Sequence, residues 1–293
     1  AIFIDSEIWP NFIYEIKKRK IKLILINARI TNKSFRRWKY FYNFGKKVFS
    51  NFDLCISSSL DTFKKLKNLN VKNVKYFENL KYISEFNKIK KLKKNSDLNK
   101  RKIWCASNTH AGEEIFCLNV HKALKKIEGN LLTIIAPRHI NRSEEIFDLC
   151  EKNNLLAQSI KNEKEKINKN TDIVIINSFG ILDYYYKFCT SVFMGKSTLK
   201  RLIEVGGQNP IEAARQGCQI YYGPYVHNFE EVYNFLAKKK IAKKIKQSED
   251  LVKQILKDFK NKKKINKSRI KQIDDFGQKI FKNTILHINR IKK

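Results

Sequence analysis

The 293-residue sequence has only 4 prolines, 10 glycines and 1 methionine. This scarcity is expected of a coding sequence that drifts toward AT-rich codons, and the same drift could account for part of the excess of lysine. Its 6 cysteines form no CxxC pair and no Cys/His cluster, which argues against a metal site and favours buried thiols in a reducing cytoplasm. No apolar run approaches the roughly 18 residues of a membrane span, and no signal-peptide pattern is present. We expect a soluble or peripheral protein without metal.

Familiar phosphate-binding and nucleophile motifs are also absent. The sequence contains no GxGxxG fingerprint, no GxxxxGK[ST] loop and no GxSxG turn. These absences count against a dinucleotide oxidoreductase and against a P-loop NTPase.

Negative charge is scarce, because 28 Asp and Glu stand against 61 Lys and Arg, a net charge of +33. A hydrophobic fraction of 42% with 12% aromatic residues is too apolar for a disordered polycation. The excess is concentrated in residues 87–102, which net +7, and in residues 238–293, which net +15. The imbalance predicts an anionic partner, such as nucleic acid, an acidic membrane surface or a phosphorylated ligand.

Short β-branched runs alternate with amphipathic stretches, a pattern typical of parallel sheets built from βαβ units. We expect an α/β fold with two Rossmann-like halves. In the first half we expect strands at 1–4, 21–27, 52–57 and 72–77, and helices near 10–19, 34–49 and 59–68. In the second we expect strands near 102–106, 131–136, 172–177, 190–195 and 218–222, and helices near 112–127, 142–152, 208–216 and 228–237.

The pattern divides the chain into three parts. Residues 1–90 form a partial N-terminal domain, residues 91–101 a basic linker, and residues 102–293 a second Rossmann-like domain with basic C-terminal helices. The sequence begins without Met, directly inside an apolar run. We therefore expect a piece of a longer protein whose N-terminal domain is incomplete.

Ligands of open α/β sheets bind at the carboxyl ends of the strands, so residues that follow strands are the candidates. Glu7 follows the first strand, where its carboxylate could act as a base, or could simply favour the dipole of the next helix. Ser107 and Thr109 lead into a helix whose N–H groups suit a phosphate, although either hydroxyl could instead cap that helix.

Two further strand ends carry polar or aromatic groups. Pro137, Arg138 and His139 place a guanidinium and an imidazole where a phosphate or carboxylate could bind. Phe179 and Gly180 follow the apolar run 173–176 and offer an aromatic surface for a base, although a plain turn is equally compatible with them.

Among these candidates, segment 206–212 has the residue pattern that points most specifically to a bound ligand. Gly206 and Gly207 allow close approach of the main chain to a ligand, and a helix starting near Asn209 and Pro210 aims its N–H groups at it. Glu212 could accept hydrogen bonds from ribose hydroxyls, or could complete a capping box with Asn209.

Taken in order, these motifs resemble those of the 3-deoxy-D-manno-octulosonic acid (Kdo) transferases of lipopolysaccharide synthesis. The similarity covers essentially the whole chain. The matching stretches are Ser6 to Asn11 (T-E-[IL]-W-P-N), Asn27 to Ile30 (N-A-R-[LI]), Asn79 to Lys81 (N-L-K), His110 to Glu114 (H-x-G-E-E), Pro137 to His139 (P-R-H) and Gly206 to Glu212 (G-G-H-N-x-x-E).

The resemblance implies an inverting transferase of GT-B architecture, with two Rossmann-like domains around a cleft. Such an enzyme moves Kdo from CMP-Kdo to a lipid A precursor, without a cofactor, at the cytoplasmic face of the inner membrane. The implied nucleotide contacts are Pro137, Arg138, Phe179, Gly180, Ile181, Asn209, Pro210, Ile211 and Glu212. Ser107, Thr109, His139, Gly206, Gly207 and Gln208 remain phosphate or cleft candidates.

The resemblance also assigns Glu7 to the acceptor side of the cleft. The family's general base, in an S-x-G-E motif, and its apolar membrane anchor have no counterpart in these 293 residues, and we expect both upstream. The two basic segments hold none of the matched motifs, so we expect them to face anionic lipid and not nucleic acid. A GT-B transferase of another nucleotide sugar and a non-catalytic polyanion- or RNA-binding relative are the alternatives.

Overall fold

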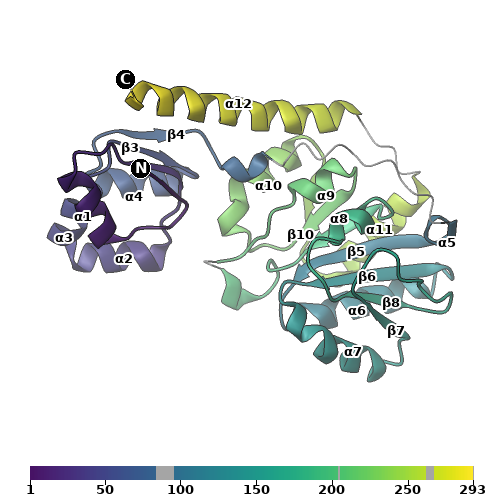
Figure 1. Ribbon diagram of the computed structural model, residues 1–293. Coiled ribbons are helices and arrows are strands. Elements are labelled where there is room, and N and C mark those ends of the chain that lie inside the picture. Colours follow the sequence, from purple (N-terminus) through teal and green to yellow (C-terminus); the bar gives the residue numbers. More distant parts are fainter. Residues whose placement is uncertain (84–95, 204, 262–266, 293) are drawn as a thin grey trace. The chain divides into compact units, whose positions relative to one another are not determined.

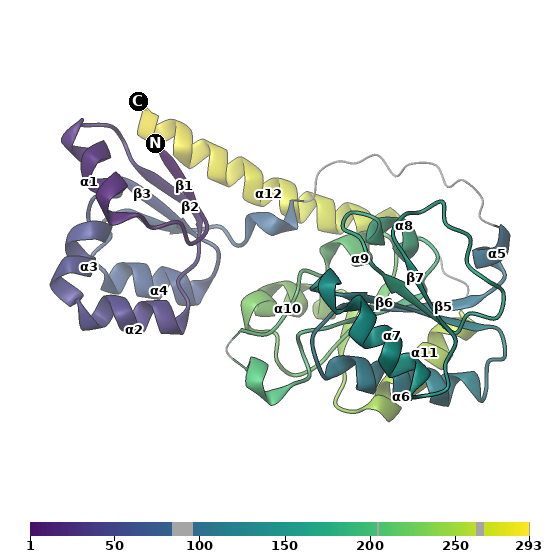
Figure 2. The same cartoon turned by 60° about the horizontal axis from the view of Figure 1, so that its bottom comes forward.

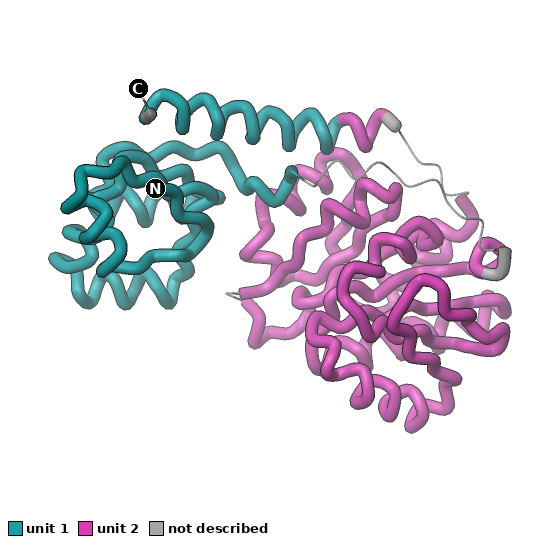
Figure 3. The backbone as a smooth tube through the Cα atoms, in the orientation of Figure 1, with its two compact units in different colours: residues 1–85, 272–293 teal, residues 86–271 magenta. Residues whose placement is uncertain are grey.

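The computed structural model describes residues 1–83, 96–203, 205–261 and 267–292 (Figure 1). They belong to two compact units, one made of residues 1–85 and 272–293 and the other of residues 86–271 (Figure 3). Each unit is built around its own parallel sheet, which confirms the predicted α/β class.

The smaller unit holds a four-stranded sheet of order β1-β2-β3-β4. All four predicted strands are present, although each is shorter at one end or both. The strands are β1 (Ile2–Ile4), β2 (Ile24–Ala28), β3 (Leu54–Ser57) and β4 (Val74–Tyr76). The helices between them are α1 (Pro10–Lys18), α2 (Asn32–Tyr40), α3 (Tyr42–Phe49) and α4 (Leu60–Asn68), and the short helix η1 (Leu80–Tyr82) follows β4. The predicted helix at 34–49 is two helices, because Phe41 leaves helical geometry with φ −101° and ψ 54°.

Both faces of the smaller sheet are covered, by segments far apart in the sequence. Leu25 and Cys55 pack with Ile13 of α1, whereas the neighbouring residues of the strands face the other way. Ile24, Leu54 and Ile56 pack with Ile288 of the C-terminal helix α12 (Lys267–Lys292). Successive residues of a strand point to opposite faces, so this sheet needs a second layer, and α12 provides it.

The division into units therefore differs from the predicted one. The sequence grouped residues 102–293 into one domain, but residues 272–293 pack with residues 1–85. The reason is the apolar face of the smaller sheet, which no helix of the first 83 residues covers. The predicted boundary at residue 90, and residues 91–95 of the predicted linker, lie outside the described residues, and α5 (Ser96–Asn99) follows them.

The larger unit holds a seven-stranded parallel sheet of order β11-β10-β9-β5-β6-β8-β7. Its strands are β5 (Lys102–Thr109), β6 (Leu131–Pro137), β7 (Ala157–Ile160), β8 (Ile173–Ile176), β9 (Ser191–Met194), β10 (Gln219–Tyr222) and β11 (Ala242–Lys244). Its helices are α6 (Glu113–Lys125), η2 (Ile140–Arg142), α7 (Ser143–Glu151), α8 (Leu182–Tyr186), η3 (Lys200–Leu202), α9 (Ile211–Arg215), η4 (His227–Phe229), α10 (Glu230–Lys238) and α11 (Ser248–Lys260).

Three helices cover one face of this larger sheet, as Figure 2 shows. Apolar side chains of α6, α7 and α11, such as Leu118, Ile146 and Ile255, pack against Trp104 of β5 and Ile135 of β6. Among the described residues, no helix combines the length and apolar character that a membrane crossing requires.

Candidate functional site

Nearly all of the predicted site residues lie on loops at the carboxyl edge of the larger sheet. Strands β5, β6, β8, β9 and β10 are mutually parallel, so the loops after them leave the sheet at the same edge. In open α/β sheets this edge is where ligands bind. The loops that carry these candidates therefore lie at one edge of the same sheet.

Glu113, the first residue of α6, is the buried centre of this edge. Its side chain is fully buried and accepts hydrogen bonds from the main-chain nitrogens of His110 at 3.0 Å, Lys196 at 2.6 Å, Ser197 at 2.9 Å and Thr198 at 3.1 Å. The Thr198 hydroxyl adds a fifth bond at 2.8 Å. One carboxylate thus joins the loop after β5 to the loop after β9.

The sequence did not single out Glu113 as a site residue. An acid in the first turn of a helix ordinarily faces water and favours the helix dipole. The pair Glu113 and Glu114 after Gly112 was the available signal, and both side chains are buried. The carboxylate of Glu114 pairs with the Arg142 guanidinium at 2.6 Å, which ties α6 to the start of α7.

Two glycines at this edge allow loops to touch at the level of the main chain. A Cβ on Gly195 would lie 2.6 Å from the Asn108 carbonyl oxygen, and one on Gly206 would lie 2.1 Å from the Tyr225 carbonyl oxygen. Such distances exclude any side chain. The close approach predicted for Gly206 is thus an approach to the protein's own backbone.

Ser107 and Thr109, at the end of β5, are both fully buried. The Ser107 hydroxyl lies 2.6 Å from the Tyr186 hydroxyl, and the Thr109 hydroxyl has no hydrogen-bond partner within the described part of the chain. The alternative that one of them caps α6 is wrong, because the helix begins after Gly112, which has φ 95° and no side-chain cap. Both residues therefore belong to the core at the end of β5 and are not exposed to a ligand.

Arg138 and His139 follow β6 and are exposed, whereas Pro137 is buried at the strand end. The main-chain nitrogen of Arg138 donates to Thr109 at 3.0 Å, which fixes this turn against β5. Its guanidinium forms no hydrogen bond or ion pair with any other described residue. A cation at a strand end, without an internal partner, is available for an anionic ligand.

His139 directly follows Arg138 in the sequence, and its imidazole contacts that of His110. The rings of His110 and His139 meet edge to face with centroids 5.8 Å apart. Burial lowers the pKa of His110, and the positive charges of Lys196 and His139 lower it further. The Nδ1 atom of His110 lies 3.2 Å from the Asn108 carbonyl oxygen, so this nitrogen carries the proton in the neutral ring and Nε2 is an acceptor.

The loop after β8 presents an apolar surface. Phe179 is 69% exposed, although it is a large aromatic side chain. Gly180 has φ 83° and open space around it, and Ile181 stands half-buried directly before α8. An exposed ring beside open backbone offers a flat surface on which a planar base could stack.

The segment 206–212 closes this edge beside β10. The main-chain nitrogen of Gly207 donates to Lys196 at 2.7 Å, and the Gln208 carbonyl accepts from the Tyr233 hydroxyl at 2.8 Å. The Asn209 side chain accepts from Ile211 at 3.1 Å, and α9 begins there, later than the predicted residue 208. Pro210 and Ile211 are buried.

Glu212 as a whole is exposed to solvent, but neighbouring protein atoms exclude water from part of its carboxyl group. This desolvation raises the pKa of Glu212, and the negative charge of Asp183 raises it further. A carboxylate with a raised pKa, on a surface near other candidate groups, is typical of functional sites.

Glu7 lies in the smaller unit, apart in the chain from the other candidates. It is exposed between β1 and α1, and its Oε2 atom accepts a hydrogen bond from the Trp9 indole at 2.8 Å. The carboxyl edge of this sheet is held by Asp5, which accepts a hydrogen bond from Asn27 and pairs with Lys81 at 3.3 Å. Asn27 also accepts from the main-chain nitrogen of Leu80 at 2.9 Å.

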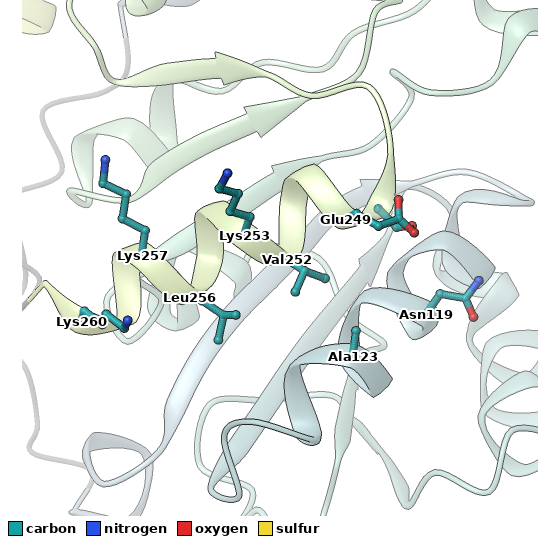
Figure 4. Close-up of a pocket in the computed structure, with 9 residues that line it drawn as sticks. Asn119, Ala123, Glu249, Val252, Lys253, Leu256, Lys257 and Lys260 are labelled. Carbon is teal, nitrogen blue, oxygen red and sulfur yellow. The ribbon is translucent and has the colours of Figure 1, made fainter.

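A pocket of about 690 Å³ lies elsewhere, between α6 and α11 (Figure 4). Val252 and Leu256 of α11 and Ala123 of α6 form its apolar part, and Lys253 and Lys257 are among its charged residues. None of the predicted site residues lines it. It lies between helices that cover the sheet, so it is separate from the candidate site at the sheet edge.

Comparison with known proteins identifies relatives along most of the chain. Residues 1–84 match the family model of 3-deoxy-D-manno-octulosonic-acid transferase. The Kdo transferase of Rickettsia felis is 31% identical over 255 residues, covering 86% of this chain and 53% of that protein. The Kdo transferase of Haemophilus influenzae is 28% identical over 80% of this chain and 56% of its own length. The chain thus spans about half the length of the curated relatives it matches.

Solved structures share the fold. The C-terminal CMP-Kdo binding domain of WaaA from Acinetobacter baumannii aligns with a TM-score of 0.51 and 22% identity, over 63% of this chain and 91% of that domain. Anabaena HepE in complex with UDP aligns with a TM-score of 0.59 and 11% identity, over 95% of this chain and 75% of that protein. These similarities establish the GT-B type of fold.

Proposed function

Because this chain is similar in sequence to Kdo transferases, we propose that it functions in a glycosyltransferase of lipopolysaccharide synthesis. The donor in this proposal is CMP-Kdo, and the acceptor is a lipid A precursor. The larger unit binds the donor, a role supported by its fold similarity to a domain described as CMP-Kdo binding. Kdo is already activated in CMP-Kdo, so the proposed reaction requires no cofactor.

One observation carries the placement of the donor: Arg138 is exposed at the carboxyl edge, and its guanidinium has no partner among the described residues. In the proposed complex it binds the phosphate of CMP, since a guanidinium can hold two phosphate oxygens at once. Phe179, Gly180 and Ile181 hold the cytosine base. Asn209 and Glu212 hold the ribose, with the ionised carboxylate accepting hydrogen bonds from its hydroxyls.

The proposed transfer is inverting. The acceptor oxygen forms a bond to the anomeric carbon of Kdo while the bond from that carbon to the phosphate oxygen breaks, and CMP leaves with the electron pair. A carboxylate takes the proton of the acceptor hydroxyl, and Arg138 stabilises the negative charge on the phosphate. Glu7, exposed in the smaller unit, is proposed to contact the acceptor and is not that base.

The binding part of this proposal is testable on the chain itself. Isothermal titration with CMP, CMP-Kdo and UDP should give binding of the two cytidine ligands and weaker binding of UDP. Equal or tighter binding of UDP would reassign the donor to another nucleotide sugar. Salt-sensitive RNA binding without CMP binding would favour the polyanion-binding alternative. Transfer itself is to be measured with the full protein encoded by the gene.

We also propose that the protein acts at the cytoplasmic face of the inner membrane, on anionic lipid. Helices α1, α2 and α3, with the residue that joins α2 to α3, expose Phe12, Tyr40, Phe41 and Phe44 by 65%, 83%, 62% and 52%. Lysines lie among these rings, and the Lys46 ammonium stands 4.3 Å from the centre of the Tyr42 ring. Aromatic and basic side chains together suit a lipid headgroup region. Vesicle sedimentation should show binding that grows with anionic lipid content, and binding independent of that content would refute the proposal.

A further inference from the structure

The loop after β9 has the features of an anion-binding loop. Residues 195–198 are Gly, Lys, Ser and Thr, and Lys196 adopts a left-handed conformation with φ 57°. Successive N–H groups around a residue of this conformation point into one concavity, which attracts anions. A phosphate of the proposed donor would be an obvious occupant.

The concavity already has an occupant. The carboxylate of Glu113 accepts hydrogen bonds from the main-chain nitrogens of Lys196, Ser197 and Thr198. Together with His110 N and the Thr198 hydroxyl, five donors surround its two oxygens, which offer about four lone pairs. Glu113 is fully buried, so this anion belongs to the fold and its bonding capacity is saturated.

The filled concavity also supports neighbouring loops of the candidate site. The Lys196 carbonyl accepts from Gly207 N at 2.7 Å. The Ser197 hydroxyl accepts from Gly223 N at 2.9 Å, and the Ser197 carbonyl accepts from Tyr225 N at 2.9 Å. The loops after β5, β9 and β10 are therefore joined through residues 196–198, whose main chain is bonded to Glu113.

We propose that Glu113 is a positioning residue, an internal anion that fills the amide concavity of residues 195–198 and thereby assembles the donor-binding edge. The donor phosphate consequently binds at Arg138 and not at these amides. This inference rests on the proposed function for the identity of the ligand, but its structural part stands without it.

The proposal predicts rescue by a small carboxylate. Glu113→Ala leaves four amides and one hydroxyl without their acceptor, and formate supplies a carboxylate of the right size. In Glu113→Ala we expect faster hydrogen exchange at residues 196–198 and CMP affinity weakened by about tenfold to hundredfold. Added sodium formate should reverse both changes, and sodium chloride at equal ionic strength should not. Glu113→Gln should show the same two changes to a smaller degree, because its amide oxygen can accept bonds at one position but its nitrogen cannot accept them at the other.

Glu144→Ala is the matched control, since Glu144 is an exposed acid in the first turn of α7. It should leave exchange at residues 196–198 and CMP affinity unchanged. If Glu113→Ala does not fold, the variant is refolded in sodium formate and, separately, in sodium chloride. We then expect a higher soluble yield in formate, and equal yields would overturn the proposal. Unchanged exchange and affinity in Glu113→Gln would overturn it as well. If the wild-type chain does not bind CMP, the proposed function fails, but the exchange and its rescue by formate still test Glu113.

Discussion

The two sheets of this protein hold their carboxyl edges in different ways. In the larger unit the centre is Glu113, fully buried and bonded mainly to main-chain N–H groups. In the smaller unit it is Asp5, which is partly exposed and bonded to the side chains of Asn27 and Lys81. Buried main-chain donors that surround a charge fix the geometry of the loops that carry them. An exposed ion pair contributes little to the free energy of folding, and salt weakens it. We therefore expect the loops at the edge of the larger sheet to exchange amide hydrogens more slowly than those at the edge of the smaller sheet.

The sheets also differ in what covers them. One face of the larger sheet is covered by α6, α7 and α11 of its own unit, but one face of the smaller sheet relies on α12, which arrives some 190 residues after β4. The smaller unit thus depends on a segment that joins the sheet only in the tertiary structure.

The largest effect is expected from Ile288→Asp. Ile288 is 6% exposed against Ile24 and Leu54, and a buried carboxylate without a partner costs several kcal/mol, about 4 or more here. We expect the smaller unit to unfold while the larger unit stays folded, as measured by residue-resolved hydrogen exchange. Ile285→Asp is the control on the same helix, since Ile285 is 39% exposed and should tolerate the charge. Equal protection of both variants would disprove the role of α12.

Arg138→Ala should come next, and its effect should be confined to ligand binding. Loss of a charge-assisted contact of roughly 1.5–3 kcal/mol weakens CMP affinity by about tenfold to hundredfold, and abolishes CMP-Kdo-dependent transfer in the full protein. The melting temperature should not change, because the guanidinium has no partner within the described residues. Arg290→Ala, at an exposed arginine of the smaller unit, provides the comparison. Full transfer activity in Arg138→Ala would remove Arg138 from the site.

The smallest effect is a pH dependence at Glu212. Its pKa is raised, so CMP affinity should fall on acidification at a pH above 4.5, the ordinary value, as the carboxylate is protonated. Glu212→Gln should bind CMP more weakly at neutral pH and flatten this profile in titrations from pH 5 to 8. The stability contribution of a group with a raised folded-state pKa is present at low pH and lost as pH rises through that pKa. Glu212→Gln should therefore be no less stable than wild type at neutral pH, and a profile identical to wild type would contradict the assignment.

Much of the fold was predictable from local patterns. The apolar runs ending near Asn27 and Ser57 gave strands, and the run at 173–176 gave a buried strand, because strands of a parallel sheet are covered on both faces and therefore apolar throughout. The short edge strands β7 (Ala157–Ile160) and β11 (Ala242–Lys244) escaped prediction. An edge strand has a single neighbour and little burial, so its sequence carries a weak pattern, as the lysines of β11 illustrate.

The candidate site was predicted in part. Arg138, Phe179 and Glu212 lie at the sheet edge where their positions after strands placed them, because strand order alone decides which edge a loop leaves. Ser107 and Thr109 follow the same rule but are buried, since only the packing of the loops above them decides exposure. Glu113 escaped prediction because its five donors come mostly from residues more than 80 positions away.

The sequence by itself determined the α/β class, the two parallel sheets, the resemblance to Kdo transferases and the loops that carry the candidate ligands. These properties follow from local periodicity and from motifs read in order. The tertiary structure alone decided that α12 completes the smaller sheet and that Glu113 fills the amide concavity after β9. Both outcomes depend on burial and on hydrogen bonds between distant segments, because an apolar helix face and a carboxylate do not specify their partners until the chain has folded.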